Sequence, residues 1–125
     1  MGIVLTDREL DIMTVLWEQG PSTASEVREH LTDELAYNTV LTMLRILEEK
    51  GYAGRTPEGR AHRYHAMVER ELAGRNALKR LVDGLFGGSA ELLLTNLVKD
   101  RKMKRADIER LRKALDDRLD EESSR

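Results

Sequence analysis

The sequence contains no cysteine, which excludes disulfide bonds and metal sites built on thiolate ligands. Aromatic residues make up only 4% of the 125 residues, so leucine, valine, isoleucine and methionine must form most of the core. No stretch approaches the roughly 20 apolar residues of a membrane helix. The N-terminus also lacks the basic patch and long apolar run of a signal peptide. We therefore expect a cytoplasmic protein.

The chain also lacks the excess of positive charge that is typical of nucleic-acid-binding proteins. Its 21 lysine and arginine residues are outnumbered by 23 aspartate and glutamate residues, which gives a net charge of −2. The distribution of charge is more informative than the total. Residues 45–63 contain five basic and three acidic residues, whereas the preceding residues are acidic overall. A DNA-binding function would therefore depend on a local basic edge.

None of the motifs expected of an enzyme is present in the sequence. It has no nucleophile elbow, no glycine-rich phosphate loop and no cluster of residues with metal-ligand spacing. His62 and His65 are three residues apart, which places them on opposite faces of a strand. We therefore expect no enzymatic activity, no catalytic residues, no metal site and no cofactor.

Two capping boxes mark the beginnings of the first two predicted helices. In each box a threonine is followed three residues later by a glutamate, at Thr6–Glu9 and at Thr23–Glu26. The first helix is expected to end at Gly20-Pro21, and the second to place Val27 and Leu31 inward. The apolar residues of the first helix are Leu10, Met13, Leu16 and Trp17.

A third helix is predicted from about Tyr37 to Lys50, with Gly51 as the glycine that ends it. One of its faces is apolar and contains Val40, Met43, Leu44 and Leu47. The opposite face and its flank carry side chains that can contact base edges, and the alternative is an ordinary solvated surface. The candidate DNA-binding residues there are Asn38, Thr39, Thr42 and Arg45.

Residues 52–66 are predicted to form a β-hairpin. Two strand-like segments, Tyr52–Thr56 and Arg60–Ala66, flank the turn-forming residues Pro57-Glu58-Gly59. The hairpin would carry arginine at its tip, where contact with phosphates positions a protein without specifying a base sequence. The candidate DNA-binding residues of the hairpin are Arg60, His62 and Arg63.

The second half of the chain is predicted to be entirely helical. A long helix begins near Glu69, Gly87-Gly88 breaks it, and Ser89 caps the next helix. A last helix follows, and its end is expected to fray from Asp120 onward. Each helix is too apolar on one side to stand alone, so we expect a homodimer with a shared core. The candidate dimerisation residues are Leu72, Leu81, Leu85, Phe86, Leu93, Leu97, Ile108, Leu111 and Leu115.

Three helices, a hairpin and three more helices form the layout of a winged helix-turn-helix protein with a helical dimerisation domain. The expected fold class is therefore mainly α with a small β-hairpin wing. In this layout the third helix enters the major groove of DNA and the hairpin is the wing. We assign residues 1–67 to the DNA-binding domain and residues 68–125 to the dimerisation domain.

At these positions the sequence resembles the BlaI/MecI-type penicillinase repressor family. The resemblance rests on the helix Leu10–Trp17, the core Thr39–Leu44, the pair Lys50-Gly51 and the wing pair Arg63-Tyr64. It implies a dimer that binds double-stranded DNA at a palindromic operator and represses antibiotic-resistance genes. It further implies a membrane-bound sensor metalloprotease as a partner and relief of repression by proteolysis, at a bond matching Asn96–Leu97.

Two other hypotheses compete with a proteolysis-controlled repressor. A winged-helix protein-interaction module that never binds DNA is consistent with the acidic net charge. It is also consistent with Ile46, Glu48 and Glu49, because the family often has basic residues at or near these positions. Salt-dependent binding to a palindrome would distinguish the two, because neutralising phosphates releases counterions. A copper-responsive repressor of the same fold would carry a C-terminal cysteine cluster, which this chain lacks.

Overall fold

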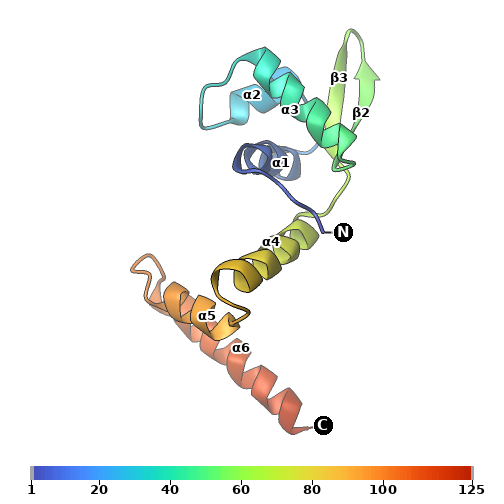
Figure 1. The fold of residues 1–125 in the computed structure, drawn as a ribbon. Helices are drawn as coiled ribbons and strands as arrows, with labels where there is room; N and C mark the ends of the chain where they lie inside the picture. Colours follow the sequence, from blue (N-terminus) through green and yellow to red (C-terminus); the bar gives the residue numbers. More distant parts are fainter. Residues whose placement is uncertain (1, 125) are drawn as a thin grey trace. The chain divides into compact units, whose positions relative to one another are not determined.

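The computed structural model describes residues 2–124 and contains six helices and a small antiparallel sheet in that range (Figure 1). The elements are α1 (Asp7–Gln19), β1 (Ser22–Thr23), α2 (Ala24–His30), α3 (Tyr37–Glu49), β2 (Ala53–Glu58), β3 (Ala61–Ala66), α4 (Arg70–Leu85), α5 (Ala90–Val98) and α6 (Arg105–Ser123). This architecture agrees with the predicted fold class.

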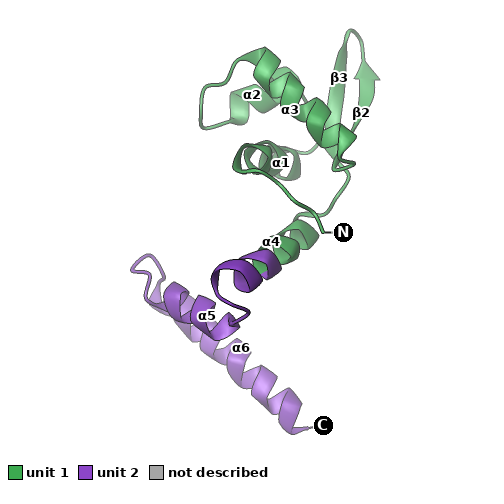
Figure 2. Ribbon diagram, viewed as in Figure 1, with its two compact units in different colours: residues 1–78 green, residues 79–125 purple. Residues whose placement is uncertain are grey.

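Two compact units make up the chain, residues 1–78 and residues 79–125 (Figure 2). Helix α4 begins in the first unit and ends in the second. The functional division assigned from sequence, 1–67 and 68–125, falls just before α4. It remains a prediction about where DNA binding and dimerisation separate.

A closed hydrophobic core lies inside the first unit. Its buried residues are Ile12, Met13, Val15, Leu16, Ala24, Val27, Val40, Leu44, Leu47, Ala53 and Tyr64. The inward positions predicted for α3 are confirmed at Val40, Leu44 and Leu47. Leu10 belongs to the apolar series of α1 but is 45% exposed, while Ile12 and Val15 occupy the inner face of the helix.

Both predicted capping boxes are present. The Thr6 hydroxyl accepts a hydrogen bond from the Glu9 backbone N–H at 3.2 Å, and the Thr23 hydroxyl accepts one from Glu26 at the same distance. Each glutamate side chain bonds back to the backbone N–H of its threonine. Two backbone donors are therefore satisfied at the beginning of each helix.

Gly51 ends α3 in a left-handed conformation, as predicted. Its φ angle is 81°, and the next residue, Tyr52, donates its backbone N–H to the Leu47 carbonyl oxygen at 3.0 Å. This pattern is a Schellman motif, which satisfies a carbonyl at the helix end. The chain is thereby turned directly into β2.

The sheet has the strand order β1-β3-β2, with both pairings antiparallel. Strand β1 was not predicted from the sequence. It consists of Ser22, which pairs with Tyr64, and Thr23, which pairs with Arg63. Two residues are too few to show an alternating pattern, and the partner strand lies far along the chain, so local sequence carries no signal for it.

The turn of the hairpin begins two residues later than predicted and is shorter. Pro57 and Glu58 belong to β2, and Glu58 pairs with Ala61, so only Gly59 and Arg60 form the turn. Gly59 has a φ of 59°, as hairpin turns with glycine in the first central position require. Pro57 is tolerated because β2 is an edge strand.

Two glycines separate α4 from α5, as predicted. Gly87 and Gly88 have φ angles of 56° and 82°, conformations that only glycine adopts easily. The Ser89 hydroxyl then caps α5 by accepting a hydrogen bond from the Leu92 backbone N–H at 3.1 Å.

Helix α6 continues to Ser123, so the fraying predicted from Asp120 is wrong. Ion pairs at helical spacing support its last turns, including Arg118 with Glu122 at 2.7 Å. Within the residues described, no single helix is long and apolar enough to cross a membrane. Only α4 and α5 together reach that length and composition, and they are bent by 100°.

Candidate nucleic-acid interface

All four candidate DNA-binding residues of α3 lie on its exposed side. Asn38, Thr39, Thr42 and Arg45 are exposed, while the opposite side of the helix is buried in the core of the first unit. The helix is therefore fixed by one face and presents polar side chains on the other. It lies next to the hairpin formed by β2 and β3 (Figure 1).

A cleft of ≈ 290 Å³ lies between α3, the beginning of α2 and the hairpin. Its lining residues are Thr23, Ala24, Ser25, Tyr37, Leu41, Arg45, Arg60, Ala61, His62 and Tyr64. Two of these are arginines and none carries a carboxylate. The structure therefore brings Arg45 of α3 together with Arg60 and His62 of the hairpin at one positively charged cleft.

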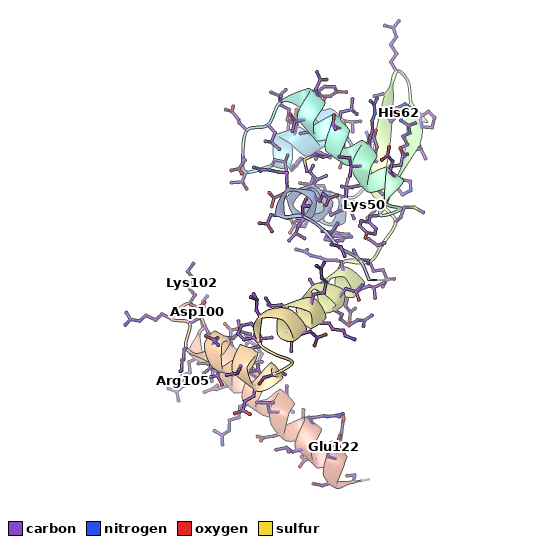
Figure 3. The ribbon with its side chains drawn as sticks, in the orientation of Figure 1. Lys50, His62, Asp100, Lys102, Arg105 and Glu122 are labelled. Atoms are coloured by element: carbon purple, nitrogen blue, oxygen red, sulfur yellow. The ribbon has the colours of Figure 1, made fainter. Side chains whose placement is uncertain are left out.

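His62 lies on β3 (Figure 3) and is half-buried, whereas Arg60 in the hairpin turn is exposed. Its Nδ1 atom and the buried hydroxyl of Tyr64 have no hydrogen-bond partner within residues 2–124. Buried polar atoms usually have such a partner. The same described range holds no group of three side chains able to bind a metal ion. His62 is one of the residues that line the cleft.

Arg63 does not extend freely into solvent. Its Nε and Nη2 atoms donate to Glu58 Oε2 at 3.1 and 2.8 Å, and Nη1 donates to the Pro21 carbonyl oxygen at 2.9 Å. Nη2 also lies 3.0 Å from Glu26 Oε1. These partners come from three separate segments, so the sequence alone gives no sign of the arrangement.

The pKa values around Arg63 reflect these contacts. Hydrogen bonds to Glu58 and then to Glu26 raise the pKa of Arg63. The pKa of Glu26 is lowered, first by the hydrogen bond from the Thr23 backbone and then by the one from Arg63. Glu26 therefore stays ionised while it both caps α2 and holds the arginine.

Lys50 forms an ion pair that holds the end of α3 against the beginning of α1 (Figure 3). Its Nζ lies 2.9 and 2.8 Å from the two carboxylate oxygens of Glu9, whose residue is only 3% exposed. Burial alone would raise the pKa of Glu9, but hydrogen bonds from Lys50 and Thr6 outweigh it and lower that pKa. This pair helps to fix the orientation of α3.

Three of the five basic residues between positions 45 and 63 are thus paired with carboxylates. Lys50 pairs with Glu9, Arg63 pairs with two glutamates, and Arg55 Nε lies 3.1 Å from Glu48 Oε2. Arg45 and Arg60 have no ion pair with any residue that the structure describes. The basic edge predicted from sequence is consequently reduced to two unpaired arginines.

The second unit shows a different kind of surface. None of its described residues, 79–124, is fully buried. Six candidate dimerisation residues are exposed: Leu72, which lies in the first unit, and Leu81, Leu85, Leu97, Ile108 and Leu115. The other three, Phe86, Leu93 and Leu111, are half-buried. Four further apolar residues outside the candidate dimerisation set are exposed: Leu78, which lies in the first unit, and Leu92, Val98 and Leu119 in the second.

The Asn96–Leu97 bond lies near the end of α5. The Asn96 side chain donates to the Leu92 carbonyl oxygen at 2.8 Å, and Leu97 is 44% exposed. Helix α5 has only nine residues and none of them is buried. The bond is therefore accessible, but it is held in helical conformation.

Comparison with known proteins places the sequence in a family. The chain matches the family described as penicillinase repressor over residues 5–117. It belongs to the penicillinase repressor family. The transcriptional regulator BlaI of Mycobacterium tuberculosis is 34% identical over 115 residues, covering 89% of this chain and 82% of the relative. The methicillin resistance regulatory protein MecI of Staphylococcus aureus is 21% identical over 113 residues, covering 89% and 92%.

Solved structures at low sequence identity share the fold of this chain. A transcriptional regulator of Thermotoga maritima has a TM-score of 0.53 at 22% identity and covers 96% of this chain and 80% of its own. A MarR family protein of Bacillus stearothermophilus has a TM-score of 0.54 at 18% identity, covering 98% and 78%. The winged-helix fold, the family and the role of transcriptional regulator rather than enzyme are confirmed.

Proposed function

We propose that this chain is a cytoplasmic homodimer that represses transcription by binding a palindromic double-stranded operator. The observation that carries the proposal is the exposed polar face of α3 beside the cleft that contains Arg45 and Arg60. In winged-helix proteins the corresponding helix enters the major groove and the wing follows the backbone. Family membership supports the same assignment.

Within this proposal α3 reads the base sequence. Arg45 can donate two hydrogen bonds to guanine and Asn38 can pair with adenine, while the methyl groups of Thr39 and Thr42 can contact thymine. All four side chains are exposed along one side of the helix. Arg60, at the tip of the hairpin, and His62, in the wall of the cleft, would contact the phosphate backbone.

The distribution of ion pairs limits the electrostatic part of binding. Arg45 and Arg60 are the two basic residues of this edge without an ion pair in the described range, whereas Lys50, Arg55 and Arg63 are neutralised by glutamates. If Arg60 meets a phosphate while Arg45 pairs with guanine, log K should fall against log salt with a slope of about −0.9 per protomer, or about −1.8 per dimer. We expect a weak salt dependence for a DNA-binding protein.

Dimerisation is proposed from the surface of the second unit. A unit in which no described residue is buried lacks the core that stabilises an isolated domain. Apolar side chains that would be costly to leave in water, such as Leu85 at 79% exposure, gain a partner surface in a second copy. A two-fold dimer also presents two copies of α3 to the two halves of a palindrome.

Relief of repression is proposed to follow cleavage of the Asn96–Leu97 bond, with a membrane-bound sensor metalloprotease as partner. Helix α5 is short, lacks buried residues and follows a two-glycine break, so it should open locally at low cost. Cleavage would separate α6 from the rest of the dimer surface. The monomer would then lose the gain in affinity from two linked half-sites.

The central experiment is selection of a binding sequence from a random duplex library, followed by titration of the full chain against the selected duplex at several salt concentrations. We expect a palindromic sequence and sequence-specific binding that Arg45→Ala reduces. Arg101→Ala, which removes an exposed arginine from the second unit, is the matched control. Failure to select any sequence would contradict the proposal.

A winged-helix module that binds another protein is the second candidate. The pairing of Lys50, Arg55 and Arg63 with carboxylates favours it, because little positive charge is left to attract phosphates. Under this hypothesis the chain would not bind duplex DNA, and no sequence would be selected from the library. The same titration therefore separates the two functions.

A further inference from the structure

Arg63 lies at the point where the hairpin leaves the rest of the sheet. Thr23 of β1 and Thr56 of β2 both pair with Arg63, and no pairing of β1 extends beyond it. Residues 57–62 therefore form a two-stranded ribbon, which is only marginally stable by itself. This ribbon carries Arg60 and His62.

The contacts of Arg63 restrain this ribbon. Its guanidinium binds Glu58, near the tip, and at the same time Glu26 on α2 and the Pro21 carbonyl oxygen. Three of its five N–H donors form hydrogen bonds to Glu58 and the Pro21 carbonyl oxygen, and Nη2 also forms an ion pair with Glu26. A two-point contact with a DNA phosphate would require at least one of these contacts to be exchanged.

We propose that Arg63 is a positioning residue that locks the wing to α2, and that it does not contact the operator. The lock consists of Arg63, Glu58, Glu26 and the Pro21 carbonyl group. Glu26 also closes the capping box of α2, so the lock joins the beginning of that helix to the tip of the hairpin. The inference rests on the proposed function, in which the wing contacts DNA, and it revises the role assigned to Arg63 from sequence.

If the lock exists, substitution of Glu58 should have an unusual effect on DNA binding. Removing a carboxylate near DNA ordinarily strengthens binding, because one like-charge repulsion disappears. If Glu58 holds the wing in place through Arg63, Glu58→Gln should instead weaken operator binding by about twofold to fivefold. The matched control is Glu49→Gln on α3, which removes an exposed carboxylate that forms no ion pair in the described range and should strengthen binding.

Two further variants separate positioning from phosphate contact. Arg63→Lys keeps the charge but cannot reach three acceptors at once, so we expect it to weaken binding as Glu58→Gln does. Arg63→Ala should weaken binding without changing the salt slope per protomer. A fall in slope of about 0.9 would instead identify a phosphate contact.

A measurement without DNA tests the lock independently of the proposed function. Amide hydrogen exchange in the full-length protein should accelerate at residues 58–62 in Glu58→Gln and Arg63→Ala, with no change at the core residues Leu44 and Leu47. If the wild-type chain binds no duplex, the proposed function fails, and this exchange measurement still decides whether the lock exists. Unchanged exchange at residues 58–62, or tighter operator binding by Glu58→Gln, would overturn the inference.

Discussion

The two units of the chain are built from similar amphipathic helices but differ in what those helices pack against. In the first unit, three helices and a small sheet close around a core that includes Ile12, Leu44 and Tyr64, each at most 1% exposed. In the second unit, no described residue is fully buried. Helical periodicity therefore predicts which face of a helix is apolar, but it does not predict what packs against that face.

The largest expected effect comes from truncating the core of the first unit. Leu44→Ala should lower the free energy of unfolding by about 2–5 kcal/mol, because it removes a fully buried side chain and leaves a cavity. The matched control, Leu115→Ala, truncates a leucine that is 53% exposed in the second unit. It should leave unfolding of the first unit unchanged and weaken dimerisation. Urea denaturation would measure the stability of both variants, and sedimentation would measure dimerisation of Leu115→Ala. Equal losses of stability would contradict the contrast between the two units.

The two units also differ in what their basic residues do. Arg45→Ala should weaken operator binding by about 1–3 kcal/mol if this arginine pairs with guanine. Lys102→Ala removes an exposed cation from the turn before α6 and should have little effect (Figure 3). Fluorescence anisotropy with the selected duplex would measure both variants. A larger effect at Lys102 would mean that the second unit, rather than α3, carries the DNA contact.

An ion pair between exposed Lys50 and the buried carboxylate of Glu9 distinguishes the first unit from the second, whose ion pairs are all on exposed side chains in the described range. Glu9→Gln should destabilise the first unit by about 1–2 kcal/mol, because Lys50 loses a charged partner at a buried site. The pKa of Glu9 is lower in the folded protein than its ordinary value of 4.5. Its contribution is therefore fully present above about pH 4.5 and is lost as the pH falls through the folded value. Denaturation between pH 3 and 7 should show a flatter pH dependence for Glu9→Gln, and parallel curves would contradict this role.

The smallest expected effect concerns the tip of the wing. Arg60→Ala should weaken binding nearly equally for all duplexes and reduce the salt slope by about 0.9 per protomer. The reason is that contact with a phosphate carries no base specificity. Titration at three salt concentrations with the selected and a scrambled duplex would test this. A loss confined to the selected duplex would show that Arg60 contacts a base.

Structural features that depend on neighbouring residues in the sequence could be predicted from it. Capping boxes, the glycine that ends α3, the two-glycine break and the inward face of α3 were all predicted, since each depends on residues within one or two turns. The family was also identified from motif order. Local signals therefore account for most of the element boundaries.

Features that depend on contacts between distant segments were not predicted. Strand β1 exists because Ser22 and Thr23 pair with β3, and the role of Arg63 depends on Glu26 and Glu58 from other elements. The outward position of Leu10 follows from the way α1 lies on the core. The length of α6 was missed for a different reason, because its ion pairs at i,i+4 spacing are a local signal that apolar periodicity does not include.

The most direct test of the contrast between the units is sedimentation equilibrium of the full chain at micromolar concentration without DNA. The account predicts a species with twice the mass of the chain, because the exposed apolar surface of the second unit requires a second copy. Leu115→Ala should shift this equilibrium toward the monomer while the first unit stays folded. A stable monomer with a fully folded second unit would contradict the account.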